Sequence, residues 1–152
     1  MEISFHKLPG DRYEIVVRGR RGPDVRLPPR PTGPTIPHDL VHAAVEEALG
    51  LTDGFWDAVA QGAAFEGFEP LAPGRHRAPG PGVLRRKGEA VMRAELAVAW
   101  AYRVWSGPAG ECRGVGRAPI DAAQTAVARA ALDEAATRWA AVPEGGVLRW
   151  EW

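Results

Sequence analysis

The sequence predicts a single α+β domain, residues 1–152, in which a small antiparallel sheet packs on three to four helices. Both ends of the chain show apolar residues alternating with polar ones, which is typical of strands with one buried face. The segments between them carry apolar residues at helical spacing. The length of 152 residues, with 45% hydrophobic and 25% charged residues, suits one globular domain with its own core.

The N-terminal part predicts three strands joined by turns. The alternating apolar positions of the first two strands are Ile3, Phe5, Tyr13, Ile15 and Val17. Residues 8–11, Leu-Pro-Gly-Asp, have hairpin chemistry, because proline presets φ and glycine accepts a positive φ. A short third strand is expected around Val25 and Leu27. The proline-rich run 28–34 should then break any ladder and act as a connector, since proline cannot donate a hydrogen bond.

Four helices should follow, and a last strand should return to the sheet. The predicted helices are residues 37–49, 53 to about 62–65, 89–105 and 119–141, and the predicted long loops are residues 69–88 and 107–119. Pro37 suits a first helical turn, Gly50 a C-cap, and Asp53 the cap of the second helix. The helix 89–105 is apolar on most sides, so we expect it to be central. The aromatic strand 147–152 should join the N-terminal sheet.

The charge balance and the single cysteine restrict the classes of function. Nineteen basic and nineteen acidic residues leave no net field to recruit nucleic acid or a membrane surface. Cys112 alone cannot form an intramolecular disulfide, and the N-terminus lacks the features of a signal peptide. We therefore expect a cytoplasmic protein. The run 114–116, Gly-Val-Gly, lacks the lysine and hydroxyl of a phosphate loop, so no nucleotide cofactor is expected.

The helix that begins near Pro37 gathers the side chains most suited to chemistry. His38 and His42 stand one turn apart on the same side, and this spacing lets both imidazoles reach one Zn²⁺. Glu46 and Glu95 are the candidates for a third ligand or a supporting residue. Glu46 lies about 12 Å from His38 along the helix axis, which makes Glu95 the better candidate for the third ligand.

The run His38-Asp39-Leu40-Val41-His42 resembles the zincin signature, in which two helical histidines bind zinc and the acid after the first is the general base. The resemblance implies a metal-dependent hydrolase with Asp39 as its catalytic base, although the family's glutamate is one methylene longer. The His-Asp pair also resembles that of HD-type phosphohydrolases. Those proteins are all-helical and need another upstream histidine, whereas His6 falls in a predicted strand.

A second interpretation makes the protein an interaction module without enzymatic activity. His42 and Glu46 can pair at i and i+4, and Asp39 complements the helix dipole without any catalytic role. Trp150 and Trp152 share one face of the last strand, and if uncovered this face would bind a protein partner or a second copy of the chain. Both interpretations remain open from the sequence.

Two segments resemble a group of small uncharacterised bacterial proteins. The residues that carry this resemblance are 36–42, 45–46, 49–51, 54–56, 59–60 and 62–63, and near the end Trp139 to Pro143, 145–146, Leu148 and Trp150. They cover about a third of the chain. The group has no assigned activity, so the resemblance implies only that residues 36–65 form one structural unit.

Overall fold

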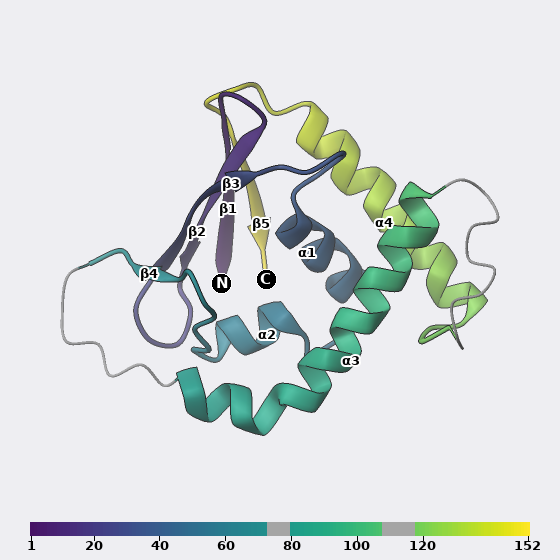
Figure 1. Ribbon diagram of the computed structural model, residues 1–152, viewed down its shortest axis with the longest axis horizontal. Helices are drawn as coiled ribbons and strands as arrows, with labels where there is room; N and C mark the ends of the chain where they lie inside the picture. The colour runs from purple at the N-terminus through teal and green to yellow at the C-terminus, as the bar shows by residue number, and fades with distance from the viewer. Residues whose placement is uncertain (73–79, 108–117) are drawn as a thin grey trace.

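The computed structural model describes residues 1–72, 80–107 and 118–152 and shows the α+β class (Figure 1). The elements are β1 Glu2–Leu8, β2 Arg12–Arg18, β3 Val25–Pro31, α1 His38–Ala48, α2 Phe55–Ala60, β4 Glu69–Pro70, α3 Gly80–Ser106, α4 Ala122–Ala140 and β5 Val147–Glu151. The five strands form one antiparallel sheet in the order β4-β3-β2-β1-β5. Helix α1 lies beside this sheet, and α3 and α4 lie on the side of α1 that faces away from the sheet (Figure 1).

The C-terminal strand joins the N-terminal sheet as the sequence predicts. β5 pairs with β1, with Ile3 opposite Trp150 and Phe5 opposite Leu148. The two ends of the chain are hydrogen-bonded to each other, because the Met1 amino group donates to the Trp152 carbonyl at 2.7 Å. The Trp152 amide in turn donates to the Met1 carbonyl at 2.8 Å. The C-terminal strand β5 therefore forms one edge of the sheet, beside the N-terminal strand β1.

The third strand is longer than predicted, and the expectation that residues 28–34 break the ladder is wrong as far as Pro31. Pro31 lies opposite Arg12, and Arg30 lies opposite Tyr13. The register shifts between Tyr13 and Ile15, so the two consecutive prolines 28 and 29 fall in an irregularity of the ladder. Beyond residue 26, β3 also has no pairing to β4, and an edge of this kind tolerates residues without an N–H.

Helix α1 has the predicted position but is more deeply buried than its sequence indicates. It follows Pro37 and ends at the C-cap Leu49, and Gly50 takes a φ of +62°, the left-handed conformation that glycine accommodates. Every residue from Asp39 to Glu46 is buried. The helix packed between the other layers is therefore α1. The expectation of a central third helix is wrong, since Met92 and Leu96 on α3 are 60% and 55% exposed.

The other helix boundaries depart from prediction in ways that local chemistry explains. Gly54, and not Asp53, is the N-cap of α2, and glycine has no side chain that could cap the helix. α3 begins at Gly80 inside the expected loop, because Pro81 is tolerated in a first helical turn. α4 begins after Asp121, which forms a capping box with Gln124. Residues 108–117 of the second expected loop lie outside the described residues.

One hydrophobic core joins the sheet to the helices. Its largest members include Phe5, Tyr13, Leu40, Trp56, Leu132, Trp139 and Trp150. Trp150 is only 7% exposed, and the Arg138 guanidinium lies 4.5 Å from the centre of its ring. Trp152 is half-buried against the same core. The aromatic face that could have served as a partner surface is thus mostly packed inside the molecule. Among the described residues, no helix has the length and apolar character needed to cross a membrane.

Candidate metal centre

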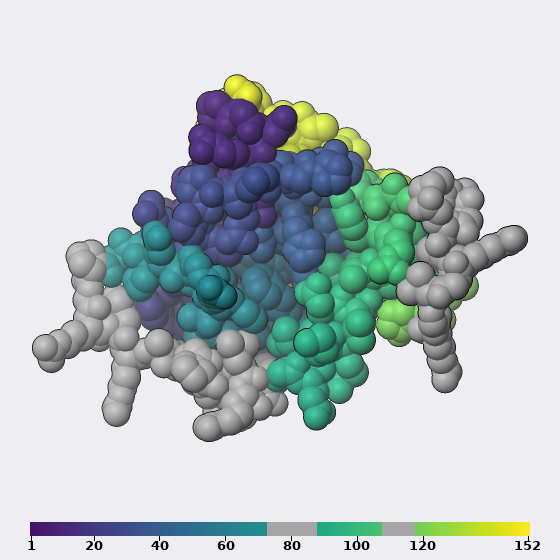
Figure 2. Space-filling model, in the orientation of Figure 1, coloured from purple at the N-terminus to yellow at the C-terminus, as the bar shows by residue number. Residues whose placement is uncertain are grey.

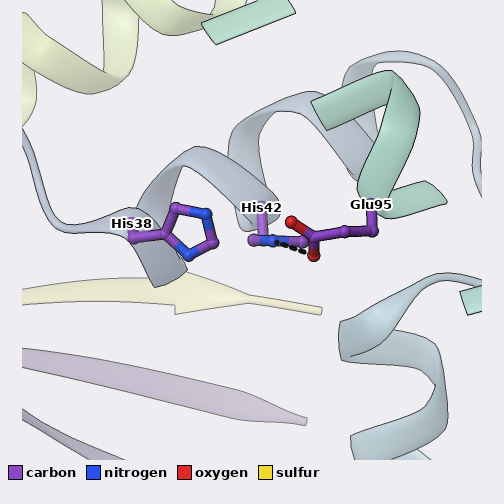
Figure 3. Close-up of side chains that lie close together, drawn as sticks. All are labelled: His38, His42 and Glu95. Atoms are coloured by element: carbon purple, nitrogen blue, oxygen red, sulfur yellow. Dashed lines mark ion pairs between the residues drawn. The ribbon is translucent and has the colours of Figure 1, made fainter. Parts of the chain in front are cut away.

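Three side chains from two helices converge beside the buried helix α1. His38 and His42 come from the first turns of α1, and Glu95 reaches them from α3 (Figure 3). Each offers one ligand atom, and these atoms all lie within 4.8 Å of one another. The i, i+4 spacing of the histidines and the choice of Glu95 over Glu46 as the third member of the cluster were both predicted from the sequence.

His42 is the central residue of this cluster. Its side chain is buried, with Nδ1 2.8 Å from Glu46 Oε1 and Nε2 3.1 Å from Glu95 Oε2. Burial by itself lowers the pKa of His42, but the hydrogen bonds and negative charges of the two carboxylates outweigh it and raise the pKa to about 9. In the metal-free protein at neutral pH, both ring nitrogens are therefore protonated and donate to carboxylates.

Glu46 lies behind His42 and is fully buried. Besides facing His42, its Oε1 accepts a hydrogen bond from the Phe55 amide, and its Oε2 accepts one from the Trp56 amide, each at 3.0 Å. These are the first two amides of α2, so Glu46 caps that helix from the preceding helix α1. The sequence could not show this contact, because the donors are backbone groups with no residue signature.

His38 and Glu95 form the accessible side of the cluster. The ring of His38 is exposed and stands edge-on to that of His42, with centroids 4.8 Å apart. Partial burial, followed by the charge of His42, lowers the pKa of His38 and favours its neutral form. The hydrogen bond with His42 lowers the pKa of Glu95, whose side chain is 45% exposed. One neutral imidazole and one carboxylate are thus open to solvent.

Asp39, the catalytic base expected from the zincin resemblance, has different contacts. The Tyr13 hydroxyl on β2 donates to its carboxylate, and Arg30 Nη1 on β3 lies 3.6 Å from the same oxygen. Burial, and then the charge of Asp39, raise the pKa of Tyr13 and keep it a proton donor. The carboxylate is therefore tied to the sheet, and Asp39 is not one of the three converging residues.

The surroundings leave the cluster reachable from one side. Figure 2 shows the atoms of α1 (mid-blue) in a recess between the segment leading into that helix, helix α3 (green) and the teal segment that follows α2. The ring centroid of Phe55 lies 5.4 Å from that of His42, which places an apolar side chain against the imidazole. A partly shielded, partly solvated group of two histidines and a carboxylate is suited to bind a divalent transition metal.

Comparison with known proteins adds no family and no relative. No protein-family model matches this chain, and neither a curated protein nor a solved structure matches it. Functional inference therefore rests on the geometry of the site.

Proposed function

We propose that this protein binds a zinc-like divalent metal ion through His38, His42 and Glu95. The observation that carries the proposal is the convergence of these three side chains from two separate helices, with ligand atoms within 4.8 Å of one another. Two ligands at about 2.0–2.1 Å from a tetrahedral Zn²⁺ are about 3.4 Å apart. The 3.1 Å separation of His42 Nε2 and Glu95 Oε2 already matches this value.

A small movement of His38 completes the set. Its ring is exposed, so a rotation toward the other two ligands meets little packing resistance. The ligand set would comprise two neutral imidazoles and one carboxylate, a combination found in catalytic zinc sites rather than closed structural ones. Because His38 and Glu95 face solvent, the fourth coordination position would be available to water or to a ligand.

The chemistry this supports is metal-assisted hydrolysis. A bound metal polarises a carbonyl or phosphoryl oxygen and lowers the pKa of a coordinated water. Asp39 has no part in this chemistry, because its carboxylate is held by Tyr13 and Arg30. The zinc-loaded protein should hydrolyse an activated ester such as 4-nitrophenyl acetate faster than the same protein stripped of metal by a chelator; equal rates, with zinc shown to be bound, would contradict the hydrolytic part alone.

The metal itself is tested by binding. Protein purified without a histidine tag should take up one equivalent of Zn²⁺, measured by titration against a chromophoric chelator. His42→Ala and Glu95→Gln should abolish or strongly weaken uptake. His6→Gln, a histidine on β1, and Glu89→Gln, an exposed carboxylate on α3, are the matched controls and should bind normally. Wild-type protein that takes up no zinc would overturn the proposal.

A further inference from the structure

The Glu46 carboxylate has a position that its role as a partner of His42 alone does not explain. It is fully buried, yet it accepts hydrogen bonds from both backbone amides at the start of α2. Because both amides belong to the backbone of helix α2, their positions are fixed, and they hold the carboxylate in one orientation. Glu46 therefore has little freedom to rotate.

We propose that Glu46 is the positioning residue of the metal site: it fixes His42 through Nδ1, so that Nε2 faces His38 and Glu95. This inference rests on the proposed metal binding and assigns a role within it. A histidine ligand commonly donates its second N–H to a carboxylate, which sets its tautomer and ring orientation. The 2.8 Å contact between His42 Nδ1 and Glu46 Oε1 has this form.

Two observations favour this role over direct ligation by Glu46. Both of its oxygens are already used, one by His42 Nδ1 and the Phe55 amide and the other by the Trp56 amide. The three side chains that converge do not include it. Glu95 occupies the Nε2 side of the imidazole, and Glu46 occupies the opposite side.

Gly54 makes this arrangement possible. A Cβ atom added at Gly54 would lie 2.3 Å from Glu46 Oε2 and 2.5 Å from its Cδ, closer than real contacts allow. A carboxylate packed against the N-terminus of α2 therefore requires glycine at this position. Gly54→Ala consequently displaces the Glu46 carboxylate while leaving its chemistry unchanged, which provides a second and independent way to disturb the same contact.

The experiment measures Zn²⁺ affinity by chelator competition at one pH, on variants first shown to be folded by circular dichroism. Loss of a carboxylate behind a ligating histidine typically costs about 10–100-fold in affinity. We expect that loss for Glu46→Gln and a loss in the same direction for Gly54→Ala. Glu47→Gln alters the neighbouring exposed carboxylate and should stay within about twofold of wild type.

Two measurements distinguish a positioning role of Glu46 from a purely structural one: the zinc affinity of the Trp56→Phe variant and the NMR signal of the His42 Nδ1 proton. Trp56→Phe removes the indole hydrogen bond to the Asp39 carbonyl and so loosens the packing of α2 on α1, but it leaves all donors to Glu46 in place. It should lower the melting temperature without lowering zinc affinity. In zinc-loaded wild type, the NMR signal of the His42 Nδ1 proton should persist, and in Glu46→Gln it should broaden or shift.

The inference is overturned if Glu46→Gln binds zinc as wild type does, or if Trp56→Phe loses as much affinity as Glu46→Gln. Displacement of the His42 Nδ1 proton by zinc would also overturn it, because the ligand atom would then be the wrong one. These results presuppose that the wild type binds zinc. Failure of the wild type itself to bind is a different result, which removes the proposed function.

Discussion

His42 lies between two carboxylates, and its protonation therefore contributes to the stability of the metal-free fold. The pKa of its imidazole is raised from 6.5 to about 9 by Glu46 and Glu95 against the opposing effect of burial. A raised pKa means that this contribution is fully present below pH 6.5 and is lost as the pH rises through 9.

The first prediction is that the metal-free protein is less stable at pH 9.5 than at pH 6.5, by on the order of 3 kcal/mol through this residue. Urea unfolding at the two pH values measures the free energies. The comparison that matters is with His42→Gln, which should lose most of the difference. An equal pH dependence in wild type and variant would contradict the pairing of His42 with the two carboxylates.

Zinc binding should depend on pH in the opposite sense. A metal on His42 Nε2 displaces the proton that this nitrogen shares with Glu95, so each ion bound below pH 9 releases one proton from His42. The second prediction is an affinity that increases by about tenfold per pH unit between pH 6.5 and 8.5. Calorimetry in buffers of different ionisation enthalpy measures the proton count. A count of zero would mean that zinc leaves His42 Nε2 protonated.

Asp39 provides the third prediction, which separates a structural acid from a catalytic one. Asp39→Asn weakens the buried hydrogen bond with Tyr13 and removes the charge facing Arg30. The expected loss is about 1–3 kcal/mol of unfolding free energy, with zinc affinity unchanged. Thermal or urea unfolding beside a zinc titration provides both values. A stable variant that binds zinc but loses all ester hydrolysis would restore Asp39 as the catalytic base.

Helix α1 shows how far a sequence pattern predicts an element. Pro37, Gly50 and the i, i+4 histidines together predict its bounds and the side from which both imidazoles project. The pattern could not show that the polar side of the helix is also buried, because that burial comes from α2 and α3, elements that lie outside the pattern of α1 itself. Glu46, a charged residue on that side, is fully buried.

The other elements show where local propensity fails. The proline-rich run from residue 28 predicted a break in the third strand, yet β3 continues to Pro31, and α3 begins at Gly80 with Pro81 in its first turn. In β3 a register shift and an unpaired edge accommodate the missing N–H groups. In α3 the proline lies in the first turn, where the backbone N–H groups have no partner within the helix. In both cases the outcome depends on neighbouring backbone, which composition does not describe.

At the start of α4, the capping box gives the fourth prediction. The Asp121 carboxylate accepts a hydrogen bond from the Gln124 backbone amide at 2.8 Å, and the Gln124 side-chain oxygen accepts one from the Asp121 backbone amide at 3.0 Å. Asp121→Ala should lower the free energy of unfolding by about 1 kcal/mol. Glu134→Ala, an exposed acid within the same helix, is the control and should change stability by less than half as much. Equal effects would mean that the box contributes nothing.

For the molecule as a whole, the site joins helices that are far apart in the chain. Glu95 reaches across from α3 to the two histidines of α1 (Figure 3), so a bound metal would crosslink the buried helix to an outer one. Glu46 extends the connection to α2. The antiparallel sheet and the C-terminal strand that pairs with β1 were predictable, because the alternation of apolar and polar residues within a strand marks its buried face. The convergence of three helices on His42 depends on packing between distant segments.

The central claim is that one metal ion is held by His38, His42 and Glu95. Crystals of the zinc-loaded protein, with diffraction recorded on either side of the zinc absorption edge, test it most directly. We predict one anomalous peak at about 2.0–2.2 Å from a ring nitrogen of His38, from His42 Nε2 and from a carboxylate oxygen of Glu95. A zinc-loaded crystal with no peak between these side chains, or with zinc bound only elsewhere, would contradict the account.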